Sequence, residues 1–263
     1  MSASALSGRT RAGEDPVASV ILATLNEREN LPELLERLWR VPLPSFEVVV
    51  IDDGSTDGTR EFLTDAARAE SRLRLIWHEG KQTTLRAQCQ GIAASRGRFV
   101  IVMDADLQHP PEVLPTIVRS LENGSALVVG SRYAEGGSVG PRSVFRAMIS
   151  RGAERIAKVF LPEARALTDP VSGLFGFRRE VFRPLDPQWR GYKLLLFLLV
   201  MARGQGVAEV GFRFELRGSG ASKVMQNYRF IRFFLTELVL AKRLENSLVR
   251  ASARTGSSAR SPR

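Results

Sequence analysis

The stretch FVIVMDADLQHPPE, residues Phe99–Glu112, decides both the fold class and the kind of site. Five apolar residues, a run typical of a buried strand, lead directly into Asp104, Ala105 and Asp106. Two carboxylates one residue apart at a strand end can bind one hard divalent cation, and Gln108 adds a neutral oxygen. Such a cation suits a reaction whose leaving group is a nucleotide diphosphate, because it offsets the charge that develops as the bond breaks. An acidic turn without a ligand is the alternative for this stretch taken alone.

The first half of the chain alternates short apolar runs with segments of helical spacing. Strands are expected at residues 18–24, 46–51, 72–77, 98–103 and 126–130, and helices at 30–40, 59–70, 83–97 and 111–124. This alternation predicts an α/β fold with a mostly parallel central sheet and helices on both faces. Further along, we expect a helix at 144–160, a buried helix or two short elements at 191–204, and a strand that runs into a Gly-rich basic loop at 207–223.

Polar residues follow four of these strands at the point where each strand ends. They are Asn26 and Glu27 after the first strand, then residues 52–59, 104–108 and 131–133 after the second, fourth and fifth. Because the carboxyl ends of parallel strands line one crevice, we expect a ligand site at this edge. Asp52 and Asp53 can accept hydrogen bonds from a ribose or a base, and simple turn formation is the alternative for them.

The composition is that of a folded chain with a basic excess. The 263 residues include 38 Lys and Arg against 28 Asp and Glu, a net charge of +10, and 44% are hydrophobic. The single cysteine, Cys89, excludes an intrachain disulfide and favours a cytosolic setting. No signal peptide is expected, and the longest apolar run, 194–202, is shorter than the roughly 20 residues that cross a bilayer. Residues 224–263 hold eight basic and two acidic residues, and no nucleic-acid-binding signature accompanies them, so no nucleic-acid partner is expected.

Eight motifs occur in one order along the chain: LNERENLPELLERL, VIDDGSTDGT, MDADLQHPPE, GSRYAEGG, ISRGAERIAKVF, DPVSGLFGFRREVF, GYKLLL and RGSGASK. Together they resemble the family 2 glycosyltransferases with the GT-A (nucleotide-diphospho-sugar transferase) fold, and among these the dolichol-phosphate or polyprenyl-phosphate mannosyltransferases. The resemblance covers residues 17–225. The early motifs are shared across family 2, whereas GSRY, DPVSGLF and RGSGASK indicate the subgroup that acts on lipid phosphates.

The resemblance implies a role for each matched position. The implied metal-binding residues are Asp104, Asp106 and Gln108, and the implied nucleotide-sugar-binding residues are Ala23, Leu25, Glu27, Asp52, Asp53, Asp104 and Ala105. The implied acceptor-phosphate-binding residues are Arg132, Arg146, Arg217 and Lys223, and the implied catalytic residues are Asp106 and Arg132. The implied cofactor is Mg²⁺ or Mn²⁺, and the implied partners are a nucleotide-sugar donor and a polyprenyl-phosphate acceptor.

Three positions depart from the family pattern. Leu25 stands where the family usually has tyrosine, and residues 80–91 (GKQTTLRAQCQG) replace a segment that is typically rich in Gly and Leu. Phe197 stands where a glutamate is usual after GYKLLL. The first two departures concern contacts with the donor nucleotide. The third concerns a contact in the part of the chain expected to bind the acceptor.

The chemistry of a phosphate acceptor agrees with the residues present. A lipid monophosphate is already an anion at pH 7, so it needs no general base, and the site has only to hold two anions in line. Arginine and lysine suit this task, and in-line attack on an α-linked sugar nucleotide gives a β-linked product. His109 could be read as a base, but its place before Pro110 favours a loop residue. A solvated basic face is the alternative for Arg132 and for Arg146.

The chain divides into a flexible N-terminal tail (1–16), the GT-A domain (17–223), an amphipathic C-terminal helical segment (224–249) and a disordered basic tail (250–263). In the helical segment one stripe is formed by Val224, Tyr228, Ile231, Leu235 and Leu238, while Phe230 and Phe233 fall outside it and Arg229, Arg232, Lys242 and Arg243 lie among them. Such a helix can lie at a membrane interface and contact an anionic surface. Burial against the domain or a dimer partner is the alternative.

These observations lead us to expect an inverting transferase, peripherally associated with the cytoplasmic face of a membrane. It would move a hexose, foremost mannose from GDP-mannose, onto a polyprenyl or dolichyl monophosphate. The same fold with UDP-glucose or another UDP-sugar is one alternative, and a family 2 transferase acting on a hydroxyl is another. A non-catalytic subunit that binds nucleotide sugar or lipid is the alternative from a different class. No residue pattern indicates the oligomeric state.

Overall fold

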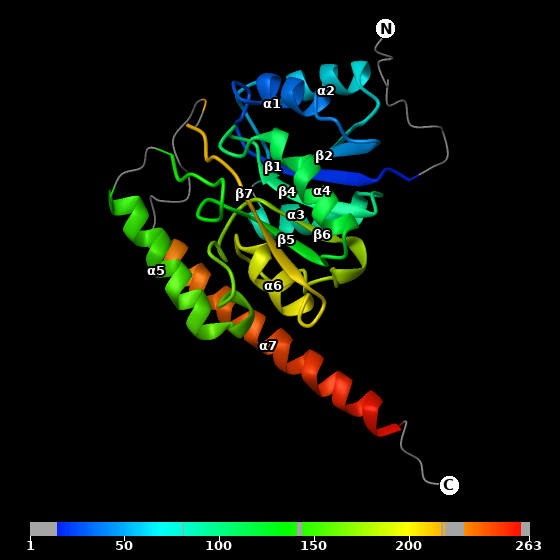
Figure 1. Ribbon diagram of the computed structural model, residues 1–263. Coiled ribbons are helices and arrows are strands. Elements are labelled where there is room, and N and C mark those ends of the chain that lie inside the picture. The colour runs from blue at the N-terminus through cyan, green and yellow to red at the C-terminus, as the bar shows by residue number, and fades with distance from the viewer. Residues whose placement is uncertain (1–14, 81, 141–143, 217, 219–228, 259–263) are drawn as a thin grey trace, which may run out of the picture.

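The computed structural model describes residues 15–80, 82–140, 144–216, 218 and 229–258. In this part of the chain a seven-stranded sheet is covered by helices on both faces. Two long helices, α5 (Val144–Phe160) and α7 (Arg229–Ser258), contact each other, and parts of both reach the hydrophobic layer on one face of the sheet (Figure 1).

The strands are β1 (Ala18–Thr24), β2 (Phe46–Asp52), β3 (Leu73–Trp77), β4 (Phe99–Asp104), β5 (Leu127–Ser131), β6 (Phe175–Arg178) and β7 (Val207–Gly211). Their order in the sheet is β3-β2-β1-β4-β6-β5-β7. All neighbours pair in parallel except β6, which is antiparallel to β4 and β5. The start of β6 therefore lies at the edge where the other strands end, which brings the loop before β6 to the expected site.

The side chains of each strand alternate between two hydrophobic layers. In β4, Phe99, Ile101 and Met103 pack in one layer, while Val100 and Val102 pack in the other. The first layer holds α1 (Leu31–Trp39), α2 (Thr59–Ala69) and α4 (Leu114–Glu122), and the second holds α3 (Thr84–Ala94), α6 (Leu194–Met201) and parts of α5 and α7. The structure thereby confirms the expected α/β class with helices on both faces.

Strand β6 is short and was not expected from the sequence. It contains Gly176, where an added Cβ would lie 2.5 Å from Cγ2 of Ile117 on α4, so only glycine lets the helix pack so close to the strand. Glycine has a low propensity for strands, so the sequence of apolar and polar residues in this segment did not indicate a strand. Three single 3₁₀ turns complete the described elements: Pro111–Val113, Pro162–Ala164 and Arg179–Val181.

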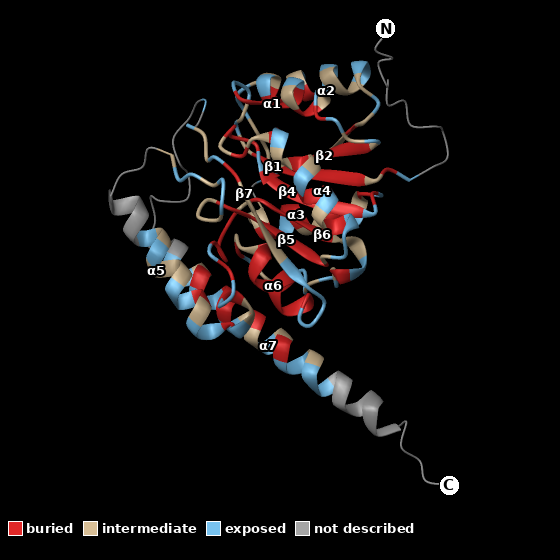
Figure 2. Ribbon diagram, in the orientation of Figure 1, coloured by how far each residue is buried: buried red, intermediate tan, exposed pale blue. Residues whose placement is uncertain are grey.

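Helix α6 consists of eight residues that are all buried (Figure 2), in agreement with the buried element expected at 191–204. Helix α3 ends at Ala94, three residues before the glycine at which we expected it to end. Asn30 occupies the N-cap position of α1, but its side chain donates to Glu27 Oε2 at 2.6 Å instead of capping the helix.

Helix α7 corrects two expectations. It continues to Ser258, so residues 250–258 are helical, although we expected a disordered tail from residue 250. Extending an existing helix fixes one residue for each new hydrogen bond, and the alanines and arginines of this stretch suit a helix. In addition, Leu238 is fully buried, whereas Ile231 and Leu235 of the same expected stripe are exposed. No helix among the described residues is long and apolar enough to cross a membrane.

Candidate active site

The carboxyl ends of three neighbouring strands meet at one edge of the sheet. In the parallel ladders Thr24 is the partner of Asp52, and Ala23 is the partner of Asp104. Neighbouring strands lie about 4.8 Å apart, so the loops that begin at these residues are adjacent. The structure therefore brings together the acidic clusters that follow β1, β2 and β4 in the sequence.

The two aspartates of the DADLQ segment lie in different environments. The Asp104 side chain is 52% exposed, whereas Asp106 is 4% exposed and its Oδ1 accepts the backbone N–H of Gln108 at 3.1 Å. Gly173 packs against Asp104, because a Cβ at residue 173 would lie 2.9 Å from Asp104 Oδ2. The Asp106 carboxylate is thus held within the loop, and the Asp104 carboxylate is half exposed.

These donors fit a hard divalent cation, because carboxylate and amide oxygens are its preferred ligands. Among the described residues, no three His, Cys, Asp or Glu side chains gather into a complete metal-binding group. A cation bound by Asp104 and Asp106 would therefore take other ligands from Gln108, from water or from a phosphate. This open coordination is what a site for a nucleotide diphosphate requires.

His109 has a structural position beside this pair. Its Nδ1 accepts the backbone N–H of Asp104 at 3.0 Å, and its ring makes edge contacts with Phe212 and Phe214. The residue is only 2% exposed. His109 therefore orients the Asp104 backbone, in agreement with the interpretation of a loop residue.

Asp52 is held by its own loop. It is fully buried, and its Oδ1 accepts hydrogen bonds from the backbone N–H of Ser55 at 3.0 Å and from Nε of Arg60 at 3.1 Å. The N–H of Gly54 also donates to Oδ1, and the Ser55 hydroxyl donates to Oδ2. With these partners Asp52 shapes the turn that follows β2.

Asp53 forms a pair that the motif did not indicate. Its Oδ1 lies 2.8 Å from Nδ1 of His78, the residue that follows β3. Burial raises the pKa of Asp53 above its ordinary value, and the contact with His78 opposes this effect. The pair places a carboxylate and an imidazole at the carboxyl ends of β2 and β3.

The remaining nucleotide-sugar positions lie along the end of β1. Ala23 and Leu25 are partly buried, and Ala105 at the end of β4 is 3% exposed. The backbone N–H of Glu27 donates to Thr59 Oγ1 at 3.1 Å, which joins the loop after β1 to the start of α2. These residues share the edge with Asp53.

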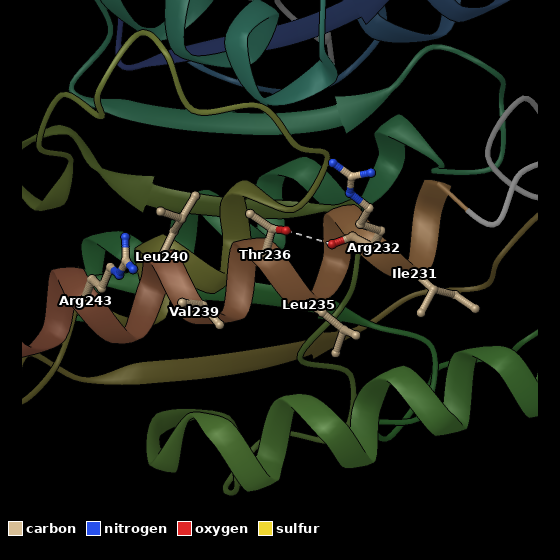
Figure 3. A pocket seen from close by; sticks show the side chains of 7 residues that line it. All are labelled: Ile231, Arg232, Leu235, Thr236, Val239, Leu240 and Arg243. Atoms are coloured by element: carbon tan, nitrogen blue, oxygen red, sulfur yellow. Dashed lines mark hydrogen bonds between the residues drawn. The ribbon is translucent and has the colours of Figure 1, made fainter.

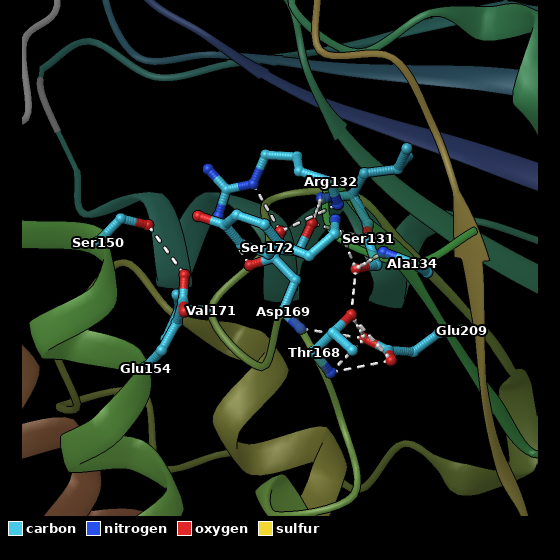
Figure 4. Close-up of polar contacts among 12 residues, drawn as sticks. Ser131, Arg132, Ala134, Ser150, Glu154, Thr168, Asp169, Val171, Ser172 and Glu209 are labelled. Carbon is cyan, nitrogen blue, oxygen red and sulfur yellow. Dashed lines mark hydrogen bonds and ion pairs between the residues drawn. The ribbon is translucent and has the colours of Figure 1, made fainter. Parts of the chain in front are cut away.

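Arg132 follows β5 and forms a buried ion pair (Figure 4). Its Nε and Nη2 lie 2.5 and 2.7 Å from the two carboxylate oxygens of Asp169, which is fully buried. Burial lowers the pKa of Arg132, but the hydrogen bonds to Asp169 outweigh this effect, and the net pKa is raised. Nη1 makes no hydrogen bond to any residue that the structure describes. Asp169 can thus orient the Arg132 guanidinium group while its Nη1 still offers N–H groups to an anion.

The loop before β6 (residues 168–174) is fixed from the side of β7. Glu209 of β7 accepts the backbone N–H of Thr168 at 2.9 Å and that of Asp169 at 3.0 Å. Ser131 at the end of β5 contacts the Thr168 hydroxyl at 2.6 Å (Figure 4). These hydrogen bonds fix the position of Asp169, whose carboxylate binds Arg132.

The other acceptor-phosphate positions lie wholly or partly outside the described part of the chain. Arg217 and Lys223 lie outside the described residues, and the side chain of Arg146, in the first turn of α5, is also not described. Gly218, the neighbour of Arg217, packs against Leu107, because an added Cβ would lie 2.7 Å from Leu107 Cδ1. Gly218 thus lies beside the metal-binding segment.

Several residues of the site escaped the sequence analysis. Asp169 and Lys193 belong to motifs that we used for the resemblance, DPVSGLF and GYKLLL, yet neither was expected to act. His78 and Glu209 belong to no motif, and the sequence carries no signal for them. Phe197, in the position of the missing glutamate, is fully buried and stacks on Trp189 with ring centroids 5.4 Å apart.

Comparison with known proteins agrees with this architecture. A model of the family described as Glycosyl transferase family 2 matches residues 19–185. A dolichol-phosphate mannosyltransferase of Pyrococcus furiosus is 38% identical over 207 residues, which make up 78% of this chain and 58% of that protein. The chain thus spans little more than half the length of that relative. The polyprenol monophosphomannose synthase of Mycolicibacterium smegmatis is 32% identical over 253 residues, 90% of this chain and 94% of that protein.

A solved structure extends the likeness to three dimensions. Glucosyl-3-phosphoglycerate synthase from Mycobacterium tuberculosis, crystallised with Mn²⁺, UDP-glucose and phosphoglyceric acid, matches with a TM-score of 0.64. The match has 22% sequence identity and covers 85% of this chain and 80% of that chain. At this identity the likeness shows the fold alone, and it confirms the expected GT-A architecture.

Proposed function

The chain belongs to glycosyl transferase family 2, and on that premise we propose that it transfers a hexose from a nucleotide-sugar donor to a polyprenyl monophosphate. The observation that carries this proposal is the placement of two groups on one sheet edge. These groups are the Asp104 and Asp106 carboxylates and the buried Arg132–Asp169 pair. The first suits a diphosphate leaving group, and the second suits an acceptor that is itself an anion.

The donor half of the site, which comprises Glu27, Asp53 and the segment 104–108, would bind the nucleotide diphosphate. A divalent cation, Mg²⁺ or Mn²⁺, held by Asp104, Asp106 and Gln108 would offset the negative charge of the leaving diphosphate. Asp53, with its partner His78, and Glu27 would contact the nucleoside. We propose GDP-mannose as the donor, supported by the mannosyltransferases among the relatives. A UDP-sugar is the alternative donor.

The acceptor half of the site, which comprises Arg132 and the loop 168–174 with Asp169, would orient the lipid phosphate. An oxygen of the phosphate attacks the anomeric carbon, the bond from that carbon to the diphosphate oxygen breaks, and the configuration inverts. Arg132 would hold the phosphate through Nη1, and we propose Arg146, Arg217 and Lys223 as its partners. No proton has to be removed from the nucleophile.

Two features support a phosphate over a hydroxyl acceptor. Phe197, where a catalytic glutamate would stand, lies in the hydrophobic core, and His109 Nδ1 already accepts a hydrogen bond from Asp104. A hydroxyl nucleophile needs a base in reach, whereas a phosphate monoanion or dianion does not.

We also propose that α7 contacts an anionic membrane surface. Ile231, Leu235 and Val239 are exposed by 62%, 42% and 45%, and they lie along one groove of about 650 Å³. The other residues that line this groove are Arg232, Thr236, Leu240 and Arg243. Ile231 and Leu235 point away from Arg232 and Thr236 (Figure 3), an arrangement that gives the helix an apolar and a basic side.

The transfer assay that tests the function uses the purified chain with polyprenyl phosphate, with and without Mg²⁺ or Mn²⁺. GDP-mannose, UDP-glucose and UDP-N-acetylglucosamine are offered in parallel. We expect metal-dependent transfer of label into the lipid from GDP-mannose. Transfer from a UDP-sugar instead would replace the donor assignment, and no lipid product from any donor would reject the proposed reaction.

Sedimentation with vesicles tests the membrane contact. We expect binding to anionic vesicles that weakens with salt, because the attraction between the basic side and the lipid headgroups is screened. Replacing both Ile231 and Leu235 by Asp should abolish the binding. Val207→Asp, which changes an exposed valine on β7, serves as the control. Equal loss in the control would argue against a role of α7.

A further inference from the structure

A buried carboxylate joins α7 to the rest of the protein. Glu237 is fully buried on the face of α7 where Phe234, Leu238 and Ala241 pack. Its Oε1 accepts the backbone N–H of Tyr192 at 2.5 Å and that of Lys193 at 2.6 Å. An apolar residue would bury this face of α7 at lower desolvation cost, so the two hydrogen bonds are what distinguishes Glu237 from its buried neighbours.

The turn that Glu237 holds is shaped for this contact. A Cβ at Gly191 would lie 2.1 Å from Glu237 Oε1, so only glycine allows the approach. The carbonyl of Gly191 accepts the backbone N–H of Leu85 at 3.0 Å, in the first turn of α3. Residues 191–193 are therefore fixed between α7 and α3, directly before α6 begins.

The Lys193 side chain reaches from this turn to the loop before β6. Its Nζ donates to the carbonyl oxygen of Val171 at 2.7 Å. Burial lowers the pKa of Lys193, and among the surrounding charges Asp104 and Asp169 raise it while Arg132 lowers it. The ammonium group thus lies within electrostatic reach of both halves of the site.

The loop that Lys193 braces touches both functional groups. Asp169 holds the Arg132 guanidinium, and the backbone of Gly173 lies against the Asp104 carboxylate. Glu209 holds the loop at Thr168 and Asp169, and Lys193 holds it at Val171. The far end of the loop is held by β5, because the N–H of Gly130 donates to the Leu174 carbonyl at 2.9 Å, so the Lys193 contact holds the middle of the loop between two fixed ends.

We propose that Glu237 and Lys193 are positioning residues, through which the docked helix α7 holds the loop 168–174 and with it the phosphate-binding fork of Arg132. This inference rests on the proposed function, because it assigns Arg132 to the acceptor phosphate. It also means that the helix proposed to contact the membrane sets the geometry of the acceptor half. The donor half meets this loop at Asp104, against which Gly173 packs, but Asp106 is held by its own turn, so donor binding should depend less on this chain of contacts.

Four variants test the inference. Lys193→Met keeps the length of the side chain and removes the donor to Val171, and Glu237→Leu removes the acceptor for two N–H groups. Glu237→Gln keeps an oxygen that can accept both. Glu245→Gln is the control, since Glu245 is another buried glutamate of α7, but its partners are Arg203 and Lys242.

The readout separates the two halves of the site. Lys193→Met and Glu237→Leu should lower kcat/KM for the lipid phosphate by about tenfold or more, because small displacements of a binding group are costly. The dissociation constant for the free nucleotide diphosphate should stay within about twofold of wild type. Glu237→Gln should recover acceptor turnover to within about threefold, and Glu245→Gln should match the wild type.

Two kinetic results would overturn the inference. One is wild-type acceptor kinetics in Lys193→Met, which remains decisive if Glu237→Leu does not fold. The other is an equal loss in Glu245→Gln, which would show that any polar change on α7 has the same effect.

Hydrogen exchange gives a readout that needs no turnover. The peptide that covers residues 168–174 should exchange faster in Lys193→Met and in Glu237→Leu than in the wild type and Glu245→Gln. If the wild type transfers no sugar, the proposed function fails, and exchange still decides whether the contacts hold the loop. If the wild type is active and exchange is unchanged in Lys193→Met, the inference fails alone.

Discussion

The donor half and the acceptor half of the site are held in different ways. In the donor half, Asp52 binds residues two to eight positions away and Asp106 binds a residue two positions away. In the acceptor half, Arg132 and Asp169 are 37 residues apart, Lys193 and Val171 are 22 apart, and Glu237 and Lys193 are 44 apart. Local turns thus hold Asp52 and Asp106 in the first half, although Asp53 and His78 are 25 residues apart, whereas the contacts named for the second half all join distant segments.

This difference has a consequence for function. A local turn forms wherever its strand forms, so the donor half should tolerate changes elsewhere in the chain. The acceptor half depends on β6, β7 and α7 packing together, and a change in one of them should reach the others. If the two halves are held independently, substitutions in one should leave the other unchanged.

The largest effect is expected for Asp106→Ala. Removing a metal-binding carboxylate should lower transfer by about a thousandfold or more, while the fold is retained, because the charge of the leaving group is no longer offset. The measurement is the initial rate together with the far-UV circular dichroism spectrum. Asp186→Ala is the matched control, because Asp186 likewise accepts the N–H of a glutamine two residues on, at 2.8 Å. Near-normal activity of Asp106→Ala would reject the metal assignment.

A smaller loss is expected for Arg132→Lys. Lysine keeps the charge but cannot form the two parallel hydrogen bonds to Asp169, so kcat/KM for the lipid phosphate should fall by about 10- to 100-fold. Nucleotide binding, measured by calorimetry, should be unchanged. Arg178→Lys is the control, since Arg178 also binds through Nε and Nη2, but to the carbonyls of Ser125 and Leu121. A loss of nucleotide binding in Arg132→Lys would show that the halves are not separable.

Asp53→Asn should show the opposite pattern. It replaces the carboxylate that pairs with His78, and we expect KM for the nucleotide sugar to rise by about five- to tenfold, while KM for the lipid phosphate stays the same. Glu70→Gln, which alters the carboxylate paired with Arg72, is the control. If the acceptor KM rose equally, Asp53 would not belong to the donor half alone.

The smallest effect concerns pH and the contact of α7. Burial raises the pKa of Glu237 from 4.5 to about 7, so between these values the folded state binds more protons than the unfolded state. The free energy of unfolding of the wild type, relative to Glu237→Gln, should therefore fall as the pH rises from 4.5 to about 7. The change should be at most about 3 kcal/mol, since one pKa unit corresponds to about 1.4 kcal/mol. Urea unfolding at several pH values measures it, and a constant difference between the two proteins would argue against the buried position of Glu237.

The local sequence pattern was sufficient to predict the first half of the protein, where strands and helices alternate. The apolar runs and the residues that follow them predicted β1 to β5, the helices between them and the edge at which Asp104, Asp106 and Asp53 meet. Strand β6 could not be predicted, because its Gly176 reflects the approach of α4 and not a propensity of the segment. The end of α7 was also missed, because a Ser- and Arg-rich composition does not show that a helix already formed will continue through it.

The sequence by itself determined the α/β class, the order of the strands along the chain and the acidic edge, because the spacing of apolar and polar residues acts over one strand or one helical turn. The tertiary structure alone decided that Asp169 orients Arg132, that Asp53 faces His78 and that Glu237 holds Lys193. These pairs join segments that are far apart in the chain, and no local pattern encodes which distant groups a fold brings within hydrogen-bond distance.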